Sequence, residues 1–220
     1  MSRLLRIDVA FDFICPWCLI GKRQLERALA RLPAEQGNVQ VDLAWHGVQL
    51  LPQLPAQGVP FAELYQQRLG SAEAVRLRQA QVQDAATAAG LDLDLQRIER
   101  MPNTANAHRL LRGAAQLGRA AQRDALLERL FEAYFLRGED LGDVDTLLTI
   151  AATCGFEPAQ LAACLRGDGS VFVADKPGLA GQGVPYFVFD RRLAVSGAQP
   201  AEVLLGAIEE ILAQPLGRSA

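Results

Sequence analysis

The hydrophobic pattern alternates between strand and helix periods along the chain, and its first part predicts a strand, a helix and a strand. Residues Leu4 to Ile14 form a short run rich in β-branched and aromatic side chains, which is typical of a buried strand. From Pro16 to Pro33 the apolar positions recur at helical spacing. Residues 39–45 then alternate with period two, which predicts a second strand.

Between Leu50 and Gly169 the pattern is helical after a loop rich in proline and glycine. Asn103 and Asp143 are expected N-caps, because their side-chain oxygens can accept from the first turn of a helix. Glycine just beyond each segment is the expected stop signal. The expected helices are Ser71–Ala89, Asn103–Leu117, Ala121–Arg137, Asp143–Cys154 and Pro158–Leu165.

Strands return after Gly169. Residues 186–189 and 193–195 are separated by three residues, a length typical of a hairpin. Pro200 is expected in the first turn of a last helix, which has one apolar stripe. We therefore expect an α/β protein in which residues 1–50 and 170–220 form one domain, with the order β-α-β and then β-β-α. Residues 51–169 are expected to form an all-helical insertion.

Composition and charge exclude several classes of protein. The chain has 220 residues, of which 50% are hydrophobic and 21% are charged, so a globular protein is expected. Its net charge of −3 comes with no basic block, so nucleic acid and an anionic membrane surface are not expected partners. Asp8 and Asp12 interrupt what would have to be the apolar part of a secretory signal. We expect a soluble, cytoplasmic protein.

The candidate chemistry lies at Cys15 and Cys18, where the first strand gives way to a helix. With Cys15 at the N-cap and Pro16 in the first helical position, backbone N–H groups and the helix dipole favour the Cys15 thiolate. Thiolates attack disulfides, so Cys15 is the predicted nucleophile, and Cys18 is placed to close a disulfide with it. No second Cys-x-x-Cys and no His pair at zinc spacing occur, so no metal is expected.

The remaining cysteines and the histidines are interpreted as packing residues. Cys154 and Cys164 follow apolar positions at helical spacing, so they are expected to behave as small hydrophobic residues, with an auxiliary redox pair as the alternative. His46 and His108 are too far apart in sequence to suggest ligand spacing, and packing or simple hydrogen bonding is expected for both.

Four stretches resemble the DsbA-like thioredoxin proteins of the FrnE branch, which are related to 2-hydroxychromene-2-carboxylate isomerases and kappa-class glutathione transferases. The resemblance implies a thioredoxin-like fold interrupted by a helical insertion, in agreement with the periodicity. The stretches are Asp12-Phe13-Ile14-Cys15-Pro16-Trp17-Cys18-Leu19-Ile20-Gly21-Lys22-Arg23, Pro102-Asn103-Thr104 with Ala107-His108-Arg109-Leu110, Gly183-Val184-Pro185-Tyr186-Phe187-Val188-Phe189, and Ser196-Gly197-Ala198-Gln199-Pro200.

The resemblance also implies roles for individual residues. Pro185 is expected to have a cis peptide bond and to lie against the redox cysteines, with the Val184 backbone presented to an extended substrate. Thioredoxins often have a buried acid where Val9 stands here, so Asp12 is the candidate for proton transfer, with an exposed strand-end carboxylate as the alternative. Trp17 is a candidate substrate contact.

Two further features near these motifs have more than one interpretation. Asn103 and Thr104 open a helix, and they are expected either to cap it or to contact substrate. Lys176 to Gly183 holds one proline and three glycines, where relatives usually have a full helix, so a shortened approach to the site is expected.

The function expected from these features is thiol-disulfide oxidoreductase. Cys15 would form a mixed disulfide with a protein or small-molecule substrate, and Cys18 would resolve it. No separate cofactor is required, with glutathione as a candidate redox partner, and the protein is expected to be a monomer or homodimer. A glutathione-dependent isomerase is one alternative, although such relatives commonly carry Ser at the first cysteine position. A redox-sensing binding protein without turnover is the other.

Overall fold

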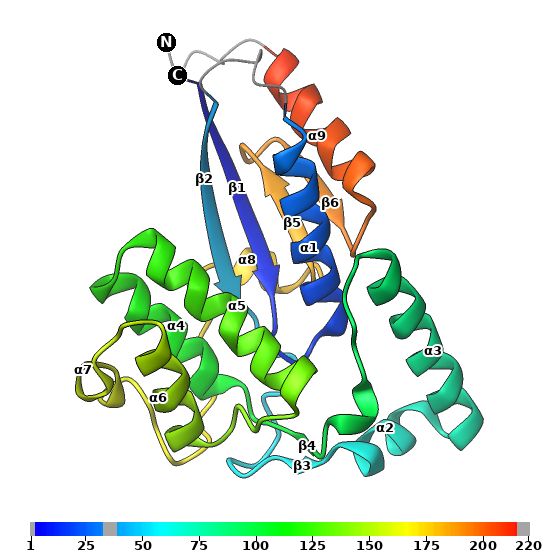
Figure 1. Ribbon diagram of the computed structural model, residues 1–220, viewed down its shortest axis with the longest axis vertical. Helices are drawn as coiled ribbons and strands as arrows, with labels where there is room; N and C mark the ends of the chain where they lie inside the picture. Colours follow the sequence, from blue (N-terminus) through cyan, green and yellow to red (C-terminus); the bar gives the residue numbers. More distant parts are fainter. Residues whose placement is uncertain (1–2, 33–38, 215–220) are drawn as a thin grey trace. The chain divides into compact units, whose positions relative to one another are not determined.

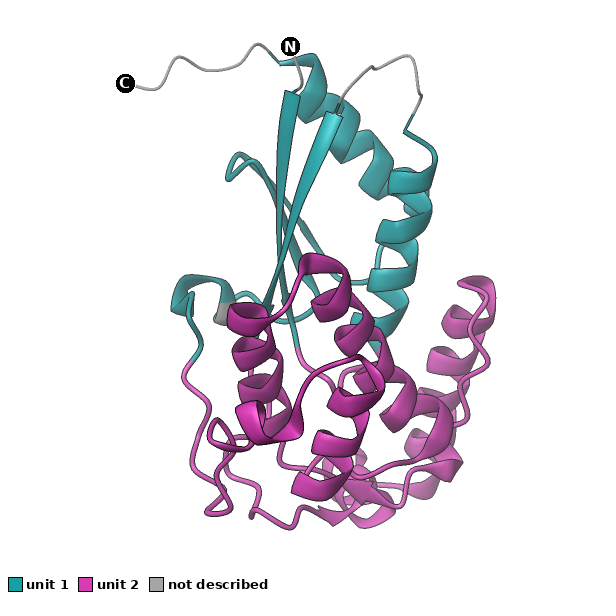
Figure 2. Ribbon diagram, turned by 60° about the vertical axis from the view of Figure 1, so that its left-hand side comes forward, with its two compact units in different colours: residues 1–11, 17–47, 174–220 teal, residues 12–16, 48–173 magenta. Residues whose placement is uncertain are grey.

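The computed structural model describes residues 3–32 and 39–214. The chain forms two compact units (Figure 2), one made of residues 1–11, 17–47 and 174–220 and the other of residues 12–16 and 48–173. We call them unit 1 and unit 2 and describe each by itself. The borders after Gly47 and Val173 lie within a few residues of the expected domain limits. That the segments 1–50 with 170–220, and 51–169, form separate domains stays a prediction.

Unit 1 is built on a four-stranded sheet with the order β2-β1-β5-β6. Strands β1 and β2 pair in parallel, whereas β5 pairs antiparallel with both β1 and β6. The expected hairpin is therefore confirmed. The strands are β1 (Arg3–Phe11), β2 (Val39–Gly47), β5 (Tyr186–Phe189) and β6 (Leu193–Ser196).

Helices α1 (Pro16–Ala30) and α9 (Ala201–Ala213) lie on the same face of this sheet (Figure 1). Alternate strand residues, among them Val9, Phe187 and Phe189, are fully buried and pack in one core with apolar side chains of both helices. Each such side chain contributes about 1.5–3 kcal/mol of burial free energy. The period-two and helical patterns of the sequence therefore meet in one core. Pro200 is the N-cap of α9, one residue before the expected first-turn position.

The first strand ends earlier than the sequence pattern predicts. β1 stops at Phe11, and the expected extension to Ile14 is wrong. Residues 12–15 instead make a turn in which the Cys15 N–H donates to the backbone oxygen of Asp12, at 3.1 Å. The turn places Cys15 directly before the first residue of α1, Pro16.

The sheet face of unit 1 opposite these helices carries a charged cluster. The Asp8 Oδ1 atom lies 2.6 Å from His46 Nε2 and accepts a hydrogen bond of 2.6 Å from Lys176 Nζ. Lys176 directly precedes the short helix α8 (Pro177–Ala180), so the ion pair ties this segment to β1. Burial acts to raise the pKa of Asp8, but hydrogen bonds from Lys176 and His46 outweigh it and hold that pKa below its usual value.

Asp8→Asn is expected to make the free energy of unfolding less sensitive to acid pH. A carboxyl group whose folded pKa is lowered contributes stability above its unfolded pKa of about 3.9, and this contribution is lost as pH falls through the folded value. Because Lys176 is half-exposed, the contribution is expected to stay below about 1 kcal/mol. Urea denaturation at pH 7 and near pH 3 measures it. Asp42→Asn is the matched control, since Asp42 is exposed and lies 3.8 Å from Arg6; equal losses in both variants would contradict the expectation.

Unit 2 is mainly helical, and its expected helices are present with shifted ends. Three features were not predicted: helix α2, the 3-10 turn η2, and the two-residue ladder in which β3 pairs with β4. The elements are β3 (Val59–Pro60), α2 (Phe61–Leu69), α3 (Ala72–Ala88), η2 (Leu95–Arg97, a 3-10 turn), β4 (Arg100–Met101), α4 (Ala105–Leu117), α5 (Ala120–Arg137), α6 (Val144–Thr153) and α7 (Pro158–Ala162).

Of the two N-caps expected in unit 2, one is confirmed and one is wrong. Asp143 caps α6 as expected, since its side chain accepts from the Thr146 N–H. Asn103 is not the N-cap of α4. That position belongs to Thr104, whose side chain makes no capping bond, and the Asn103 Oδ1 atom accepts from the Ala105 N–H instead.

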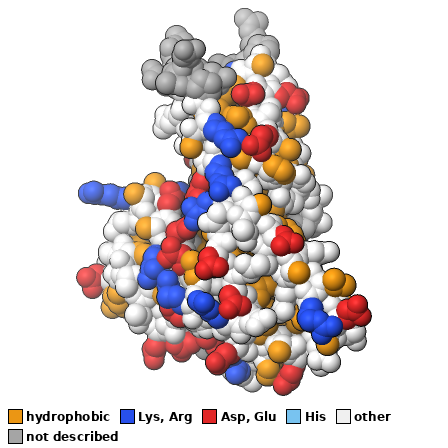
Figure 3. All heavy atoms as spheres, turned by 45° about the vertical axis from the view of Figure 1, so that its right-hand side comes forward, with side chains coloured by type: hydrophobic (Ala, Val, Ile, Leu, Met, Phe, Trp, Pro, Cys, Tyr) orange, Lys and Arg blue, Asp and Glu red, His pale blue; other side chains and the backbone are white. Residues whose placement is uncertain are grey.

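The surface carries charges of both signs. On the face seen in Figure 3, Lys and Arg side chains are interspersed with Asp and Glu, so no large field of one sign forms there. Within residues 3–32 and 39–214, no helix combines the length and the apolar character needed to cross a bilayer.

Candidate active site

The Cys15-Pro16-Trp17-Cys18 motif occupies the start of α1. Cys15 and Cys18 are both buried, with 7% and 0% of their surface exposed, and both are thiols. Trp17 between them is half-buried. The chain passes from unit 2 to unit 1 within the motif, after Pro16. Cys15 thus sits directly before a helix, where the helix dipole favours an anion.

Pro185 packs onto the helix that carries Cys18. The Val184–Pro185 peptide bond is cis, as the resemblance implies. Pro185 is buried, and a Cβ atom built on Gly21 would lie 3.1 Å from Pro185 Cγ and 3.0 Å from Phe187 Cζ. Gly21 follows Cys18 by three residues, so Pro185 contacts α1 within one turn of that cysteine. The contact needs the absence of a side chain at Gly21.

Gly21→Ala is expected to destabilise the protein by about 1 kcal/mol, because overpacking costs roughly 1–3 kcal/mol and helix propensity returns only about 1. The buried Phe187 ring and Pro185 cannot move aside without disturbing the core. The matched control is Gly206→Ala in α9, where a Cβ meets nothing within 4 Å. The control should gain up to about 1 kcal/mol. Urea denaturation compares the two, and a stabilised Gly21→Ala would show that the Pro185 contact yields without cost.

Asp12 is buried in unit 2 and is not an exposed strand-end carboxylate. No part of its surface is exposed. Its Oδ2 accepts a hydrogen bond of 2.7 Å from the Leu50 N–H, and its Oδ1 lies 3.1 Å from His108 Nε2. Its backbone oxygen accepts from Cys15, so one residue joins the loop after β2, helix α4 and the cysteine turn. A buried carboxylate needs such partners to remain ionised.

His108 is enclosed by aromatic rings on α4. Its ring centroid lies 5.0 Å from that of Phe13 and 5.0 Å from that of Phe172, and its side chain is 1% exposed. The Arg112 guanidinium lies over the Phe172 ring, 4.8 Å from its centroid. The packed ring and its contact with Asp12 agree with the interpretation of His108 as a packed or hydrogen-bonded residue, but the sequence did not indicate Asp12 as the partner. The only sequence signal was its place in the second stretch of the family resemblance.

Asn103 and Thr104 are buried, with 3% and 1% of their surface exposed. The Asn103 amide donates to the backbone oxygens of Leu54 and Gly169, and its oxygen accepts from Gln49 and from the Ala105 N–H. These bonds hold loops of unit 2 to the start of α4. The arrangement favours the structural interpretation of Asn103 over substrate contact.

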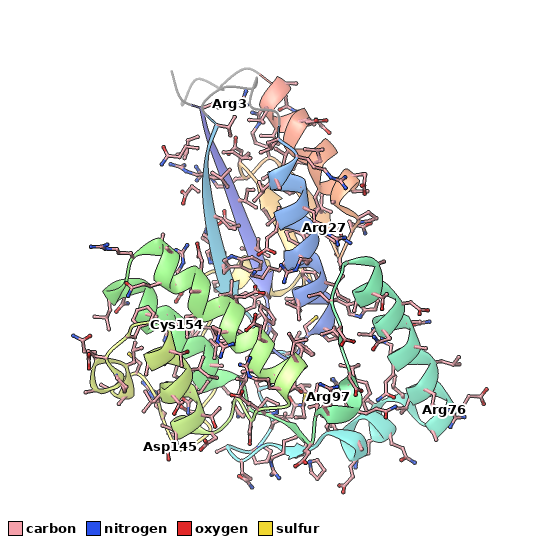
Figure 4. The ribbon with its side chains drawn as sticks, viewed as in Figure 1. Arg3, Arg27, Arg76, Arg97, Asp145 and Cys154 are labelled. Carbon is pink, nitrogen blue, oxygen red and sulfur yellow. The ribbon has the colours of Figure 1, made fainter. Side chains whose placement is uncertain are left out.

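Cys154 and Cys164 are half-buried thiols, and Cys164 lies in the turn that follows α7. Cys154 lies at the end of α6, opposite to Asp145 at its start (Figure 4), and burial raises its pKa. The Cys164 Sγ atom packs over Gly113, where a built Cβ would come within 2.8 Å. Among the described residues, no group of three or more His, Cys, Asp or Glu side chains could hold a metal ion.

Comparison with solved structures extends over nearly the whole chain. A probable DsbA oxidoreductase from Streptomyces coelicolor superposes with a TM-score of 0.83 at 26% identity, over 98% of this chain and 93% of that one. A 2-hydroxychromene-2-carboxylate isomerase gives 0.63 at 14% identity, over 94% and 95%. The cytosolic disulfide reductase DsbM from Pseudomonas aeruginosa, also solved with GSH, gives 0.56 at 18% identity, over 94% and 95%. The last two likenesses establish the fold alone.

The sequence itself matches one family. Residues 6–209 match the DSBA-like thioredoxin domain, from the first strand to the last helix. The match includes the Cys-x-x-Cys turn, the whole of unit 2 and the strand that follows Pro185. With its α/β sheet and helical insertion, this chain belongs to the family of DSBA-like thioredoxin domain proteins.

Proposed function

We propose that the protein is a thiol-disulfide oxidoreductase in which Cys15 is the nucleophile and Cys18 the resolving thiol. The observation that carries the proposal is the position of the two thiols, one directly before α1 and one in its first turn, in a chain of the DsbA-like family. Pro185, which packs on the same helix beside Gly21, is assigned to the substrate side of the site. Two cysteines, and no serine at the first position, favour this chemistry over glutathione-dependent isomerisation.

The reaction consists of two exchange steps. The Cys15 thiolate attacks one sulfur of a substrate R–S–S–R′, forms Cys15–S–S–R and releases R′–S⁻. The Cys18 thiolate then attacks the Cys15 sulfur, releases R–S⁻ and leaves the Cys15–Cys18 disulfide. Two electrons pass from the protein to the substrate, and two thiols of a small-molecule pool such as glutathione reduce the pair again. In the oxidising direction the same steps run in reverse.

Three further residues are given roles in this proposal. Asp12 is the candidate for proton transfer, since it is a buried carboxylate that is bonded to an imidazole and to the turn that holds Cys15. The Val184 backbone is assigned to an extended substrate, and the half-buried Trp17 ring to its apolar part. We propose a reducing compartment, the cytoplasm, as its place of work, by analogy with DsbM, which is described as cytosolic and was solved with GSH.

Catalytic reduction of a neutral disulfide tests the proposal. With hydroxyethyl disulfide as substrate and glutathione as reductant, the protein is expected to turn over many times. Cys15→Ser is expected to lose at least about a thousandfold of this rate, because no nucleophile remains. A single stoichiometric reaction without turnover would favour a redox-sensing binding protein. Glutathione-dependent conversion of 2-hydroxychromene-2-carboxylate that survives in Cys15→Ser would favour an isomerase.

A further inference from the structure

The α2–α3 hairpin of unit 2 encloses a hollow whose two charged lining residues are both arginines. Gly70 ends α2 in the left-handed conformation, with φ at 83°, and Ser71 caps α3 by accepting from the Ala74 N–H. This tight connection brings the last turn of α2 beside the first half of α3. The two helices line a hollow of about 290 Å³ with the side chains of Tyr65, Arg68, Leu69 and Arg78.

Tyr65 is held in place and lies within electrostatic reach of the nucleophile. Its ring stacks on that of Phe61, with centroids 4.3 Å apart, and Phe61 is 4% exposed. Burial raises the pKa of Tyr65, and the charge of Cys15 raises it further, whereas Arg78 and Arg68 act in the opposite direction. Tyr65 is therefore a neutral phenol near pH 7, and it interacts electrostatically with Cys15 and with both guanidinium groups.

The charges at this hollow favour a negatively charged ligand. Its described lining holds two arginines and no carboxylate. Arg68 and Arg78 are both exposed, so a ligand from solution can reach them. Guanidinium groups bind carboxylates through paired, charge-assisted hydrogen bonds, and a phenol adds one more donor.

We propose that Tyr65, Arg68 and Arg78 form a subsite for a carboxylate of the substrate, so that the protein prefers disulfides carrying a negative charge near the sulfur that Cys15 attacks. The proposal rests on the proposed function and names its substrate class. The carboxylate can come from a small acidic thiol or from an acidic residue beside a cysteine in a peptide. Both sources share the same chemistry at the arginines.

Single-turnover oxidation of the reduced protein tests the subsite with three disulfides of similar length. The probes are dithiodipropionate, which is anionic, hydroxyethyl disulfide, which is neutral, and cystamine, which is cationic. Stopped-flow tryptophan fluorescence follows the closing of the Cys15–Cys18 disulfide. Arg68→Gln combined with Arg78→Gln is expected to lower the ratio of the anionic to the neutral rate constant at least about tenfold, the loss expected for charge-assisted bonds. The cystamine rate should rise relative to the neutral one.

Arg76→Gln is the matched control for net charge. Arg76 lies on α3 (Figure 4) and lines the neighbouring hollow, which shares Tyr65 with the proposed subsite but contains neither Arg68 nor Arg78. The control is expected to keep the wild-type ratio. Two cystine peptides that differ only in Glu or Gln beside the cysteine distinguish the sources: a preference for the Glu peptide assigns the subsite to peptides, and a preference confined to dithiodipropionate assigns it to small acids.

The outcomes separate this inference from the proposed function. A wild-type protein that reacts with the neutral disulfide, but whose charge preference is unchanged in the double variant, overturns the subsite and leaves the function standing. An equal fall in the ratio of anionic to neutral rate constants in Arg76→Gln would also overturn the subsite, because a general effect of net charge would then explain the preference. A reduced protein that oxidises none of its probes through Cys15 would instead contradict the proposed function. Urea denaturation of each variant checks that the fold is retained.

Discussion

Cys18→Ser is expected to turn the protein into a trap for its own substrates. Cys15 would still attack a disulfide, but serine cannot displace the bound thiol from the Cys15 sulfur at a useful rate. Resolution would then depend on thiols from solution, which lack the high effective concentration of a neighbour three residues away. We expect the mixed disulfide to persist at least about a thousandfold longer than in the wild-type protein. Mass spectrometry of the acid-quenched protein, and non-reducing gels, measure it directly.

The trapping experiment is best done with Cys154 and Cys164 both replaced by alanine. Both thiols are half-buried, one at the end of α6 and one in the turn after α7, so their loss should affect stability more than exchange. A Cys15→Ser, Cys18→Ser protein is then the blank, since it has no cysteine. Adducts that form equally on Cys18 in a Cys15→Ser protein would reverse the assignment of nucleophile and resolving thiol. Rapid release of substrate from Cys18→Ser would show that another group resolves the intermediate.

Much of the fold could be predicted because it depends on local periodicity. The strands of unit 1 alternate buried and exposed residues, and the helices of unit 2 repeat their apolar positions, so both periods are visible in the sequence. The early end of β1 could not be predicted, because it depends on a partner far along the chain. Asp12 leaves the strand to accept from the Leu50 N–H, 38 residues away.

The missed elements lacked a periodic signal. Strands β3 and β4 hold two residues each, too few to show an alternation. Helix α2 did have signals that could have found it, namely Pro60 directly before it and Gly70 directly after it. Without α2, Tyr65 and Arg68 could not be placed beside Arg78 from the sequence.

The residues of the candidate site also differ in whether a local sequence signal predicts them. Cys15 and Cys18 carry their chemistry in their spacing and in the strand-to-helix context, so the sequence alone points to them. His108 carries no such signal, because its role depends on a carboxylate 96 residues earlier in the chain. A histidine inside an amphipathic helix is compatible with simple packing, and only the structure shows that its Nε2 atom lies against Asp12. Long-range polar pairs therefore mark the limit of what this sequence reveals.

The buried Asp12–His108 pair gives the other large expected effect. His108→Leu would leave the Asp12 carboxylate buried without its imidazole, and breaking a buried pair in this way costs about 3–5 kcal/mol of stability. Asp12→Asn in the same protein removes the stranded charge while keeping an oxygen that can accept from Leu50. The double variant is therefore expected to be more stable than His108→Leu alone. Urea denaturation at pH 7 measures both, as a double-mutant cycle with Asp12→Asn.

The same cycle separates a structural role of the pair from a role in proton transfer. If Asp12 moves the proton of the thiol exchange, Asp12→Asn should slow the resolution of mixed disulfides and flatten its pH dependence, even where the variant remains fully folded. His108→Gln, which keeps a polar partner for the carboxylate, should then retain the pH dependence better than Asp12→Asn does. A stable Asp12→Asn protein with the wild-type pH profile would confine Asp12 to holding the Cys15 turn. A loss below about 1 kcal/mol in His108→Leu would show that the pair is not a stabilising ion pair.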